Sequence, residues 1–320
     1  MTKFHKVHLL LLLVINVTFT LAQQPDPAVK EACTMYKRTI FEERVAISFL
    51  IPNAPVTWES IDHCQGSRPL IVGGQPADPK EFPHMARLGN RNSKNETNWF
   101  CGGTLISNRL VLTAAHCLFS LDGAVNVVRL GDLDFASETE DAEPEDFGVL
   151  NATEHPGFKQ SELYNDIAIL ELDREVKFNA YKHPACLPFE DGSQQDNFIA
   201  IGWGYQKFAG KPSTKLLKVN LKNFADRCEL AREIVELPNG FDPKSQLCVG
   251  STDRKDTCNG DSGGPLLTYH KEFPCMYHVM GVTSTGIDCD TPNVPSLYTQ
   301  AHNYLDWIKQ QLAATATRHK

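Results

Sequence analysis

The chain has 320 residues, of which 42% are apolar and 22% charged, and its formal net charge is −8. This composition is typical of a folded globular protein. The sequence contains no basic block that could neutralise phosphates, so no nucleic-acid partner is expected.

The first segment is typical of a secretory signal peptide. Lys3 and Lys6 precede a short apolar run from Leu9 to Val14, and the segment closes on Ala22. The run is shorter than the roughly 20 apolar residues that a membrane-spanning helix needs. We therefore expect residues 1–22 to be removed and the protein to be secreted to the extracellular space, with no membrane partner.

Residues 23–70 differ from the rest of the chain, because prolines interrupt them and charges cluster in them. A short helix is expected from about Pro27 to Phe49. A piece of this length cannot bury a hydrophobic core of its own. We interpret residues 23–70 as a pro-segment that two cysteines tether to the following domain.

From Ile71 onward, short apolar segments alternate with Gly, Pro, Asn and Asp. This pattern predicts an all-β barrel or sandwich over residues 71–320. Asn108 and Arg109 form a natural hairpin turn between two such segments. One helix is expected near the C-terminus, because the apolar residues between Asn303 and Leu312 recur on one helical face.

The chain has an even number of cysteines and a predicted secretory route, so we expect five disulfides. No cysteine or histidine pair has the spacing of a zinc site, so no metal is predicted. Two sequons, at Asn95 and Asn151, are candidate glycosylation sites. The ten cysteines are Cys33, Cys64, Cys101, Cys117, Cys186, Cys228, Cys248, Cys258, Cys275 and Cys289.

Three motifs carry the chemistry of a serine nucleophile. Ser262 lies in Gly260-Asp261-Ser262-Gly263-Gly264-Pro265, where glycines permit a tight loop and keep side chains away from a developing oxyanion. His116 ends the segment Thr113-Ala114-Ala115-His116, and Asp166 opens another apolar segment. A serine hydroxyl needs a neighbouring base, and the base needs a group that fixes its tautomer.

These motifs, in this order, resemble the chymotrypsin–trypsin family of serine peptidases from Ile71 to about Leu312. The resemblance implies two orthogonal six-stranded β-barrels with the active site between them. It makes His116 the general base, Asp166 its orienting partner and Ser262 the nucleophile. The N–H groups of Gly260 and Ser262 are then expected to form the oxyanion hole.

The resemblance also implies a zymogen. In similar enzymes, cleavage before a sequence such as Ile71-Val72-Gly73-Gly74 creates an amino group that pairs with the aspartate before the nucleophile, which is Asp261. A buried carboxylate is costly unless it is paired, so this pairing orders the active site. The bond to be cut joins Leu70 to Ile71. An enzyme that prefers cationic residues should not cut after leucine, so a separate upstream protease that accepts leucine is expected.

Specificity follows from the same resemblance. Asp256 corresponds to the base of the primary pocket, where a carboxylate selects Arg or Lys. Ser284 and Gly286 correspond to the pocket wall, with Thr285 where the family usually has tryptophan. Ser296 stands where similar enzymes usually have glycine and should narrow the pocket.

The leucine at the cleavage site and the phrase Lys80–Ala86 are similar to the snake-like branch of arthropod cascade proteases. A full clip domain, which has six cysteines, is absent because the pro-segment contains only Cys33 and Cys64. The resemblance pairs Cys101 with Cys117, Cys228 with Cys248, Cys258 with Cys289, and Cys186 with Cys64. Cys33 and Cys275 remain and are paired by elimination.

Calcium is the one cofactor that the sequence suggests. Acidic residues crowd one segment, at a place where some members of the similar family bind calcium. A solvated acidic loop without an ion is the alternative. The segment contains Asp132, Asp134, Glu138, Glu140, Asp141, Glu143, Glu145 and Asp146.

The predicted function is a secreted serine endopeptidase in an extracellular proteolytic cascade. Its expected partners are protein substrates, the upstream protease and serpin-type inhibitors. A digestive or venom protease is an alternative with the same chemistry. A catalytically dead homologue that acts as a binding cofactor is an alternative of another class, although such homologues usually lack the serine.

Overall fold

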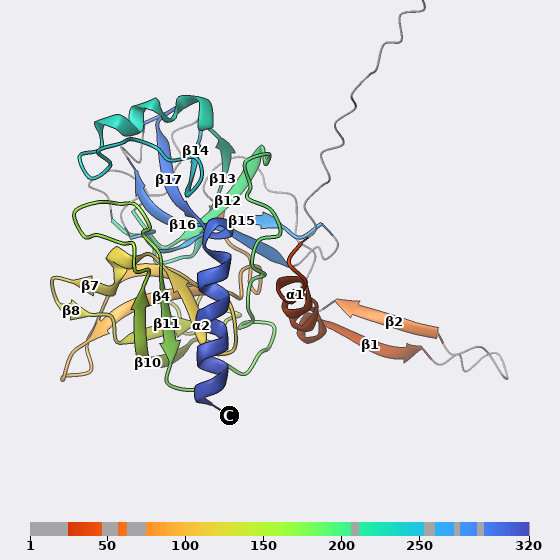
Figure 1. The fold of residues 1–320 in the computed structure, drawn as a ribbon. Helices are drawn as coiled ribbons and strands as arrows, with labels where there is room; N and C mark the ends of the chain where they lie inside the picture. Colours follow the sequence, from red (N-terminus) through yellow and green to blue (C-terminus); the bar gives the residue numbers. More distant parts are fainter. Residues whose placement is uncertain are drawn as a thin grey trace, which may run out of the picture.

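The computed structural model describes residues 25–46, 57–62, 75–205, 211–252, 260–271, 276–286 and 291–319, with the backbone alone for 39–46 and 57–62. Within these ranges the chain from residue 75 onward forms two β-barrels that pack against each other (Figure 1). The expected signal peptide lies outside the described residues, as do Cys64, Leu70, Ile71, Asp256, Cys258, Cys275 and Cys289.

The first barrel closes from six antiparallel strands in the order β10-β11-β6-β5-β4-β9. Its paired strands β6 and β11 are buried along their whole length. A small β7–β8 hairpin, Phe119–Ser120 with Gly123–Ala124, follows β6. The barrel strands are β4 Met85–Arg91, β5 Thr97–Leu105, β6 Leu110–Thr113, β9 Val127–Leu130, β10 Glu145–Glu154 and β11 Ala168–Leu172.

The second barrel has the order β12-β15-β16-β17-β14-β13, and a pairing of β12 with β13 closes it. The short strand β3, Gln75–Pro76, adds to the free side of β13. The two-barrel fold expected from the sequence is therefore confirmed. The strands are β12 Asn197–Gly202, β13 Leu217–Asn223, β14 Gln246–Gly250, β15 Pro265–Tyr269, β16 Tyr277–Gly286 and β17 Pro295–Gln300.

One hydrophobic core joins the two barrels. It combines residues such as Val111 and Leu170 from the first barrel with Val279 and Val282 from the second, all of them buried. A separate cluster fills the second barrel around Leu221 and Tyr298. Loops that end at the junction of the barrels are therefore held by packing from both sides, which suits a site that needs fixed geometry.

The C-terminal helix α2 extends over Leu305–Arg318 and lies along the first barrel (Figure 1). It begins two residues after the expected start, because Ala301–Tyr304 forms a 3₁₀ turn, and it continues past Leu312. Its last turn is anchored by Arg318 and His319, whose side chains lie 2.5 and 2.8 Å from the carboxylate of buried Glu171. A second 3₁₀ segment, Ala225–Glu233, lies beside β14 and β17.

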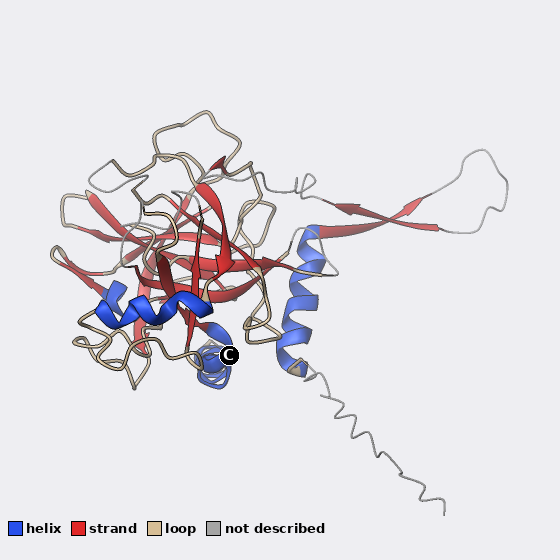
Figure 2. Ribbon diagram, turned by 90° about the horizontal axis from the view of Figure 1, so that it is seen from above, coloured by secondary structure: helices blue, strands red, loops and turns tan. Residues whose placement is uncertain are grey.

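The N-terminal segment forms helix α1, Pro27–Ile40, which ends nine residues before the expected Phe49. Residues Phe41–Ala46 (β1) instead pair with Thr57–Asp62 (β2) as an antiparallel ribbon that points away from the barrels in both views (Figures 1 and 2). The β-branched and aromatic residues after Thr39 explain the change from helix to strand.

Helix α1 packs on the barrels with one face. Val29 and Cys33, one helical turn apart, are 3% and 1% exposed, and Tyr36 donates a hydrogen bond of 2.9 Å to the carbonyl of Ile106. The Asp26 carboxylate caps the helix by accepting the N–H of Ala28 at 3.0 Å and also contacts Lys309 of α2 at 2.7 Å. No described helix is long and apolar enough to cross a bilayer.

Candidate active site

His116 and Asp166 meet because the strands that carry them are neighbours. His116 lies in the 3₁₀ turn η1, Ala115–Leu118, directly after β6, and Asp166 directly precedes the region of β11 that pairs with β6. The backbone N–H of His116 donates to Asp166 Oδ1 at 3.0 Å, and the ring nitrogen Nδ1 of His116 lies 2.7 Å from Asp166 Oδ2. A carboxylate can only accept, so Nδ1 carries the proton and Nε2 of the neutral ring is left as a base.

The Asp166 side chain is fully buried, and the second barrel donates one hydrogen bond to its carboxylate and one to its backbone carbonyl. Ser284 on β16 donates to Asp166 Oδ2 at 2.5 Å, and Thr299 on β17 donates to the Asp166 carbonyl at 2.8 Å. From the sequence, Ser284 is expected only in the wall of the substrate pocket, and Thr299 is not expected at the site. No local pattern marks either contact, because both depend on the way the barrels pack.

The pKa of His116 reflects two opposing effects. Burial disfavours the imidazolium, but the hydrogen bond and the charge of Asp166 outweigh it and raise the pKa above 6.5. The side chain of His116 remains 29% exposed, so a substrate can reach it. The ring is therefore a somewhat stronger base than a free histidine.

Ser262 lies on a tight loop at the junction of the barrels. Its carbonyl accepts the N–H of Gly102 from β5 at 2.7 Å, and the N–H of Gly263 donates to Thr283 at 2.8 Å. Gly263 has φ +76°, and a Cβ there would lie 2.2 Å from Thr113 Oγ1, so no other residue fits. The serine is partly exposed and is held against the strands that lead to His116.

No hydrogen bond joins the Ser262 hydroxyl to His116 within the described part of the chain, where His116 Nε2 lies 3.7 Å from Cys117 Sγ. Catalytic hydrogen bonds are often long before a substrate binds, so this geometry is compatible with proton transfer. Among the described residues, the N–H groups of Gly260 and Ser262 donate to no acceptor. They are thus available to a developing negative charge.

Asp261, beside the nucleophile, is 8% exposed and is held in a slot formed by two glycines. Its Oδ1 accepts the N–H of Gly204 at 2.8 Å. A Cβ at Gly202 or Gly204 would lie 1.9 or 2.4 Å from the carboxylate oxygens. The two glycines flank Trp203, and no motif in the sequence marks them as part of the site.

Three of the four residues expected to line the primary pocket lie together on two paired strands. Ser284 and Gly286 are on β16, and Gly286 pairs directly with Ser296 on β17. Ser296 is 1% exposed, and its Oγ would lie 3.0 Å from a Cβ at Gly286. The fourth residue, Asp256, is outside the described residues.

The disulfides confirm two expected pairs and overturn two others. Cys101–Cys117 and Cys228–Cys248 are present as expected. Cys186, however, pairs with Cys33 and not with Cys64, so the pairing of Cys33 with Cys275 is also wrong. Helix α1 lays Cys33 beside Cys186, with the Cα atoms 5.1 Å apart, which elimination by cysteine number could not foresee.

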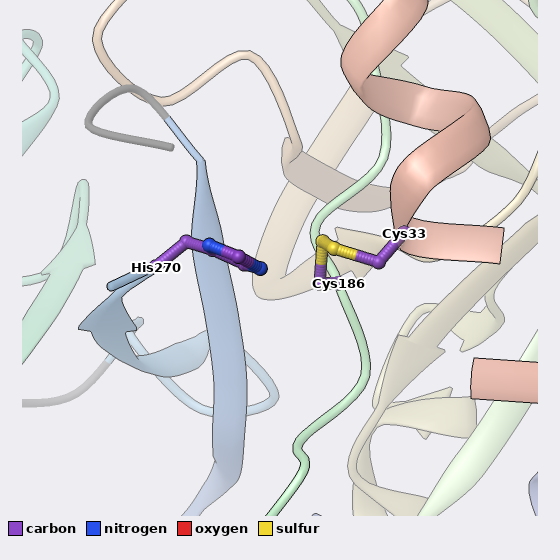
Figure 3. Close-up of side chains that lie close together, drawn as sticks. All are labelled: Cys33, Cys186 and His270. Carbon is purple, nitrogen blue, oxygen red and sulfur yellow. A yellow bond between two sulfur atoms is a disulfide. The ribbon is translucent and has the colours of Figure 1, made fainter. Parts of the chain in front are cut away.

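Figure 3 shows this disulfide with the ring of His270 directed towards it. The three side chains come close enough to suggest a metal site, but both sulfurs are already committed to the covalent bond. The disulfide ties the N-terminal segment to the barrels at a point far along the sequence from the expected cleavage site.

Both sequons lie on the surface. Asn95 is exposed in the β4–β5 turn, and Asn151 is exposed in β10. Their accessibility suits glycan attachment, which stays a prediction.

Comparison with known proteins identifies the family of this chain. Residues 71–308 match the family model described as Trypsin. The chain belongs to the trypsin family. As a member of this family it is a serine endopeptidase, a hydrolase of peptide bonds, and the alternative of a non-catalytic binding protein is not favoured.

Three of the similar proteins come from insects. The chain is 40% identical over 256 residues to serine protease snk of Drosophila melanogaster, a match that covers 77% of this chain and 58% of that protein. It is 36% identical to a venom protease of Bombus pensylvanicus (74% and 96% covered) and 34% identical to phenoloxidase-activating factor 3 of Holotrichia diomphalia (76% and 72% covered). The chain therefore spans less than two thirds of the Drosophila protein.

Replacing Ser284 by alanine should test its contact with Asp166. We expect kcat to fall about 10- to 150-fold, because the loss of one hydrogen bond to a buried carboxylate is worth roughly 1.5–3 kcal/mol. KM for a small peptide substrate should change little. A large rise in KM with unchanged kcat would instead assign Ser284 to substrate binding alone.

Proposed function

We propose that this trypsin-family chain cleaves peptide bonds with Ser262 as nucleophile. His116 Nε2 takes the hydroxyl proton as Ser262 Oγ attacks the carbonyl carbon, and the N–H groups of Gly260 and Ser262 stabilise the oxyanion. His116 then gives the proton to the leaving amine. In a second step, water hydrolyses the acyl-enzyme. The observation that carries the proposal is the buried, fully hydrogen-bonded Asp166 carboxylate, 2.7 Å from His116 Nδ1.

We further propose that the chain is made as a zymogen and activated by cleavage between Leu70 and Ile71. The Asp261 carboxylate, almost fully buried beside the nucleophile, supports this step, because a buried carboxylate favours a cation as its partner. The new amino group of Ile71 is the proposed cation. The disulfide between Cys33 and Cys186 would keep the pro-segment attached after cleavage.

The proposed setting is an extracellular proteolytic cascade, with secretion directed by residues 1–22. The relative named phenoloxidase-activating factor supports a role in activating another protein. Leucine before the cleaved bond supports activation by a separate protease rather than by the enzyme itself. Protein substrates and serpin-type inhibitors are the partners that such a role implies.

The proposed specificity is for Arg or Lys before the cleaved bond, with Asp256 at the base of the pocket. A carboxylate in a desolvated pocket is satisfied by a cationic side chain and rejects a neutral one. Ser296, paired with Gly286, is expected to shorten the pocket.

The test uses the secreted zymogen with residues 67–70 replaced by a recognition site for a highly specific protease that leaves Ile71 as the new N-terminus. Cleavage should raise kcat/KM by at least about 10²–10³-fold, the equivalent of forming a buried ion pair. Peptides that differ only in the residue before the cut should show at least about a 10²-fold preference for Arg or Lys.

The control is Asp261→Asn, which keeps the shape of the side chain and can still accept the Gly204 N–H. We expect this variant to be cleaved normally and to remain as inactive as the uncleaved protein. Full activity of the cleaved variant would contradict the zymogen proposal. A preference for Leu or Phe would contradict the assignment of Asp256 and leave the peptidase chemistry standing.

A further inference from the structure

Lys182 is a buried cation in the segment that connects the two barrels. Its side chain is 2% exposed, which makes it one of the largest fully buried side chains of the described part of the chain. Burying an ammonium group is costly unless oxygens replace the lost water. The surroundings of its Nζ atom therefore need an explanation.

Three oxygens of the acidic segment surround this ammonium. Lys182 Nζ donates to the carbonyl oxygen of Glu143 at 3.2 Å and to its carboxylate at 3.0 Å, and it lies 3.0 Å from the carboxylate of Glu145. A backbone carbonyl combined with two carboxylates is the kind of oxygen shell that a hard cation such as Ca²⁺ takes. The charge is also balanced, because Arg174 contacts the same Glu145 at 3.1 Å.

The loop is shaped to receive the lysine. Gly131 has φ +73°, and a Cβ there would lie 2.4 Å from the Glu143 carbonyl oxygen and 3.2 Å from Lys182 Cγ. The Gly131 carbonyl accepts the Glu143 N–H at 3.0 Å. Asn179 holds both Glu143 and Lys182 in place. Its side-chain NH₂ group donates to the Glu143 carboxylate, and its side-chain oxygen accepts the backbone N–H of Lys182, each at 2.9 Å.

Other acidic residues of the segment have partners of their own. Asp141 contacts Lys80 at 2.8 Å, and Asp146 contacts Arg129 at 2.6 Å. Glu140 accepts the N–H of Asp134 at 2.8 Å. Several of the carboxylates that suggested calcium are thus met by protein cations and backbone donors.

We propose that the ammonium of Lys182 is the built-in cation of the loop from Gly131 to Asp146 and takes the place of a bound calcium ion. The loop then keeps its structure in the absence of calcium. This proposal does not depend on the proposed peptidase mechanism, because its test measures folding and ion binding of the zymogen.

The test compares the zymogen with Lys182→Met, which keeps an unbranched apolar stem but removes the charge. The Tm of the natural protein should be the same in EDTA and in millimolar CaCl₂. The variant should lose roughly 5–15 °C in EDTA, because two carboxylates lose their cation. Calcium should restore most of this loss, whereas NaCl at matched ionic strength should not.

Two further variants make the result specific. Lys80→Met removes a cation that contacts the same loop through Asp141 alone, so a small fall in Tm and no calcium response are expected. Adding Glu143→Gln to Lys182→Met should abolish the calcium response. If Lys182→Met fails to fold in EDTA, refolding with CaCl₂ should recover it.

Two outcomes would overturn the proposal. One is calcium binding by the natural protein in calorimetric titration, with slower hydrogen exchange in residues 131–146. The other is a Lys182→Met variant that neither binds calcium nor is stabilised by it.

Discussion

Replacing Ser262 by alanine is expected to lower kcat of the cleaved enzyme by on the order of 10⁶-fold. We propose that the Ser262 hydroxyl forms the acyl-enzyme. We assign this role to no other hydroxyl on the loop from Gly260 to Pro265. Substrate binding should be retained, because the side chain becomes only slightly smaller. Peptide hydrolysis by the purified cleaved variant, measured beside the natural enzyme from the same preparation, gives the result.

The variant should fold and remain as stable as the natural protein, since Ser262 is partly exposed and its backbone carbonyl still accepts the Gly102 N–H. Thermal unfolding is the control. A folded variant that keeps more than about one per cent of the activity would show that another residue is the nucleophile.

Replacing Asp166 by asparagine is expected to lower kcat by on the order of 10⁴-fold, even though the side chain keeps its shape. The asparagine amide would donate to His116 Nδ1, so the ring would carry its proton on Nε2 and could not accept one from Ser262. The loss of the carboxylate charge also leaves the imidazolium without stabilisation. Steady-state kinetics of the cleaved variant measure the effect.

The pH profile of this variant separates a chemical role from a structural one. In the natural enzyme, activity should rise as pH passes through the pKa of His116, which Asp166 raises above 6.5. Without the carboxylate, burial alone acts on the ring and lowers its pKa, so the acidic limb should move to lower pH. An unchanged limb would mean that Asp166 does not set the protonation of His116.

The general form of the fold could be predicted because short β-branched segments separated by turn residues are a local signal. The C-terminal helix was found for the same reason, since Leu305 and Ile308 recur at helical spacing and both are buried. Its start and end were misplaced. The Arg318 and His319 contacts with Glu171 that extend it cross about 150 residues of sequence, and no local pattern reports them.

The pairing of His116 with Asp166 could be predicted because each residue stands at the end of an apolar strand in a recognisable motif. The partners of Asp166 could not, since Ser284 and Thr299 reach it across the junction of the barrels. The error over Cys186 has a similar origin. Its partner depends on where helix α1 docks, and the docking is set by Val29 and Tyr36, whose role is not visible from cysteine spacing.

Calcium illustrates the limit of composition. Eight carboxylates in one segment suggest an ion, but the cation that meets Glu143 and Glu145 comes from Lys182, 37 residues beyond the second of them. The number of acidic residues in a segment gives no information about a lysine from another part of the chain that contacts the segment in the fold.

The proposal that Ser262 is a nucleophile activated by cleavage is tested most directly by labelling the active site with a fluorophosphonate probe, which reacts with an activated serine. The zymogen and the form cleaved before Ile71 are treated in parallel, and the site of attachment is located by mass spectrometry. We predict one adduct, on Ser262, formed quickly in the cleaved protein and at least about 10²-fold more slowly in the zymogen. An adduct on another residue, or equal labelling of both forms, would contradict it.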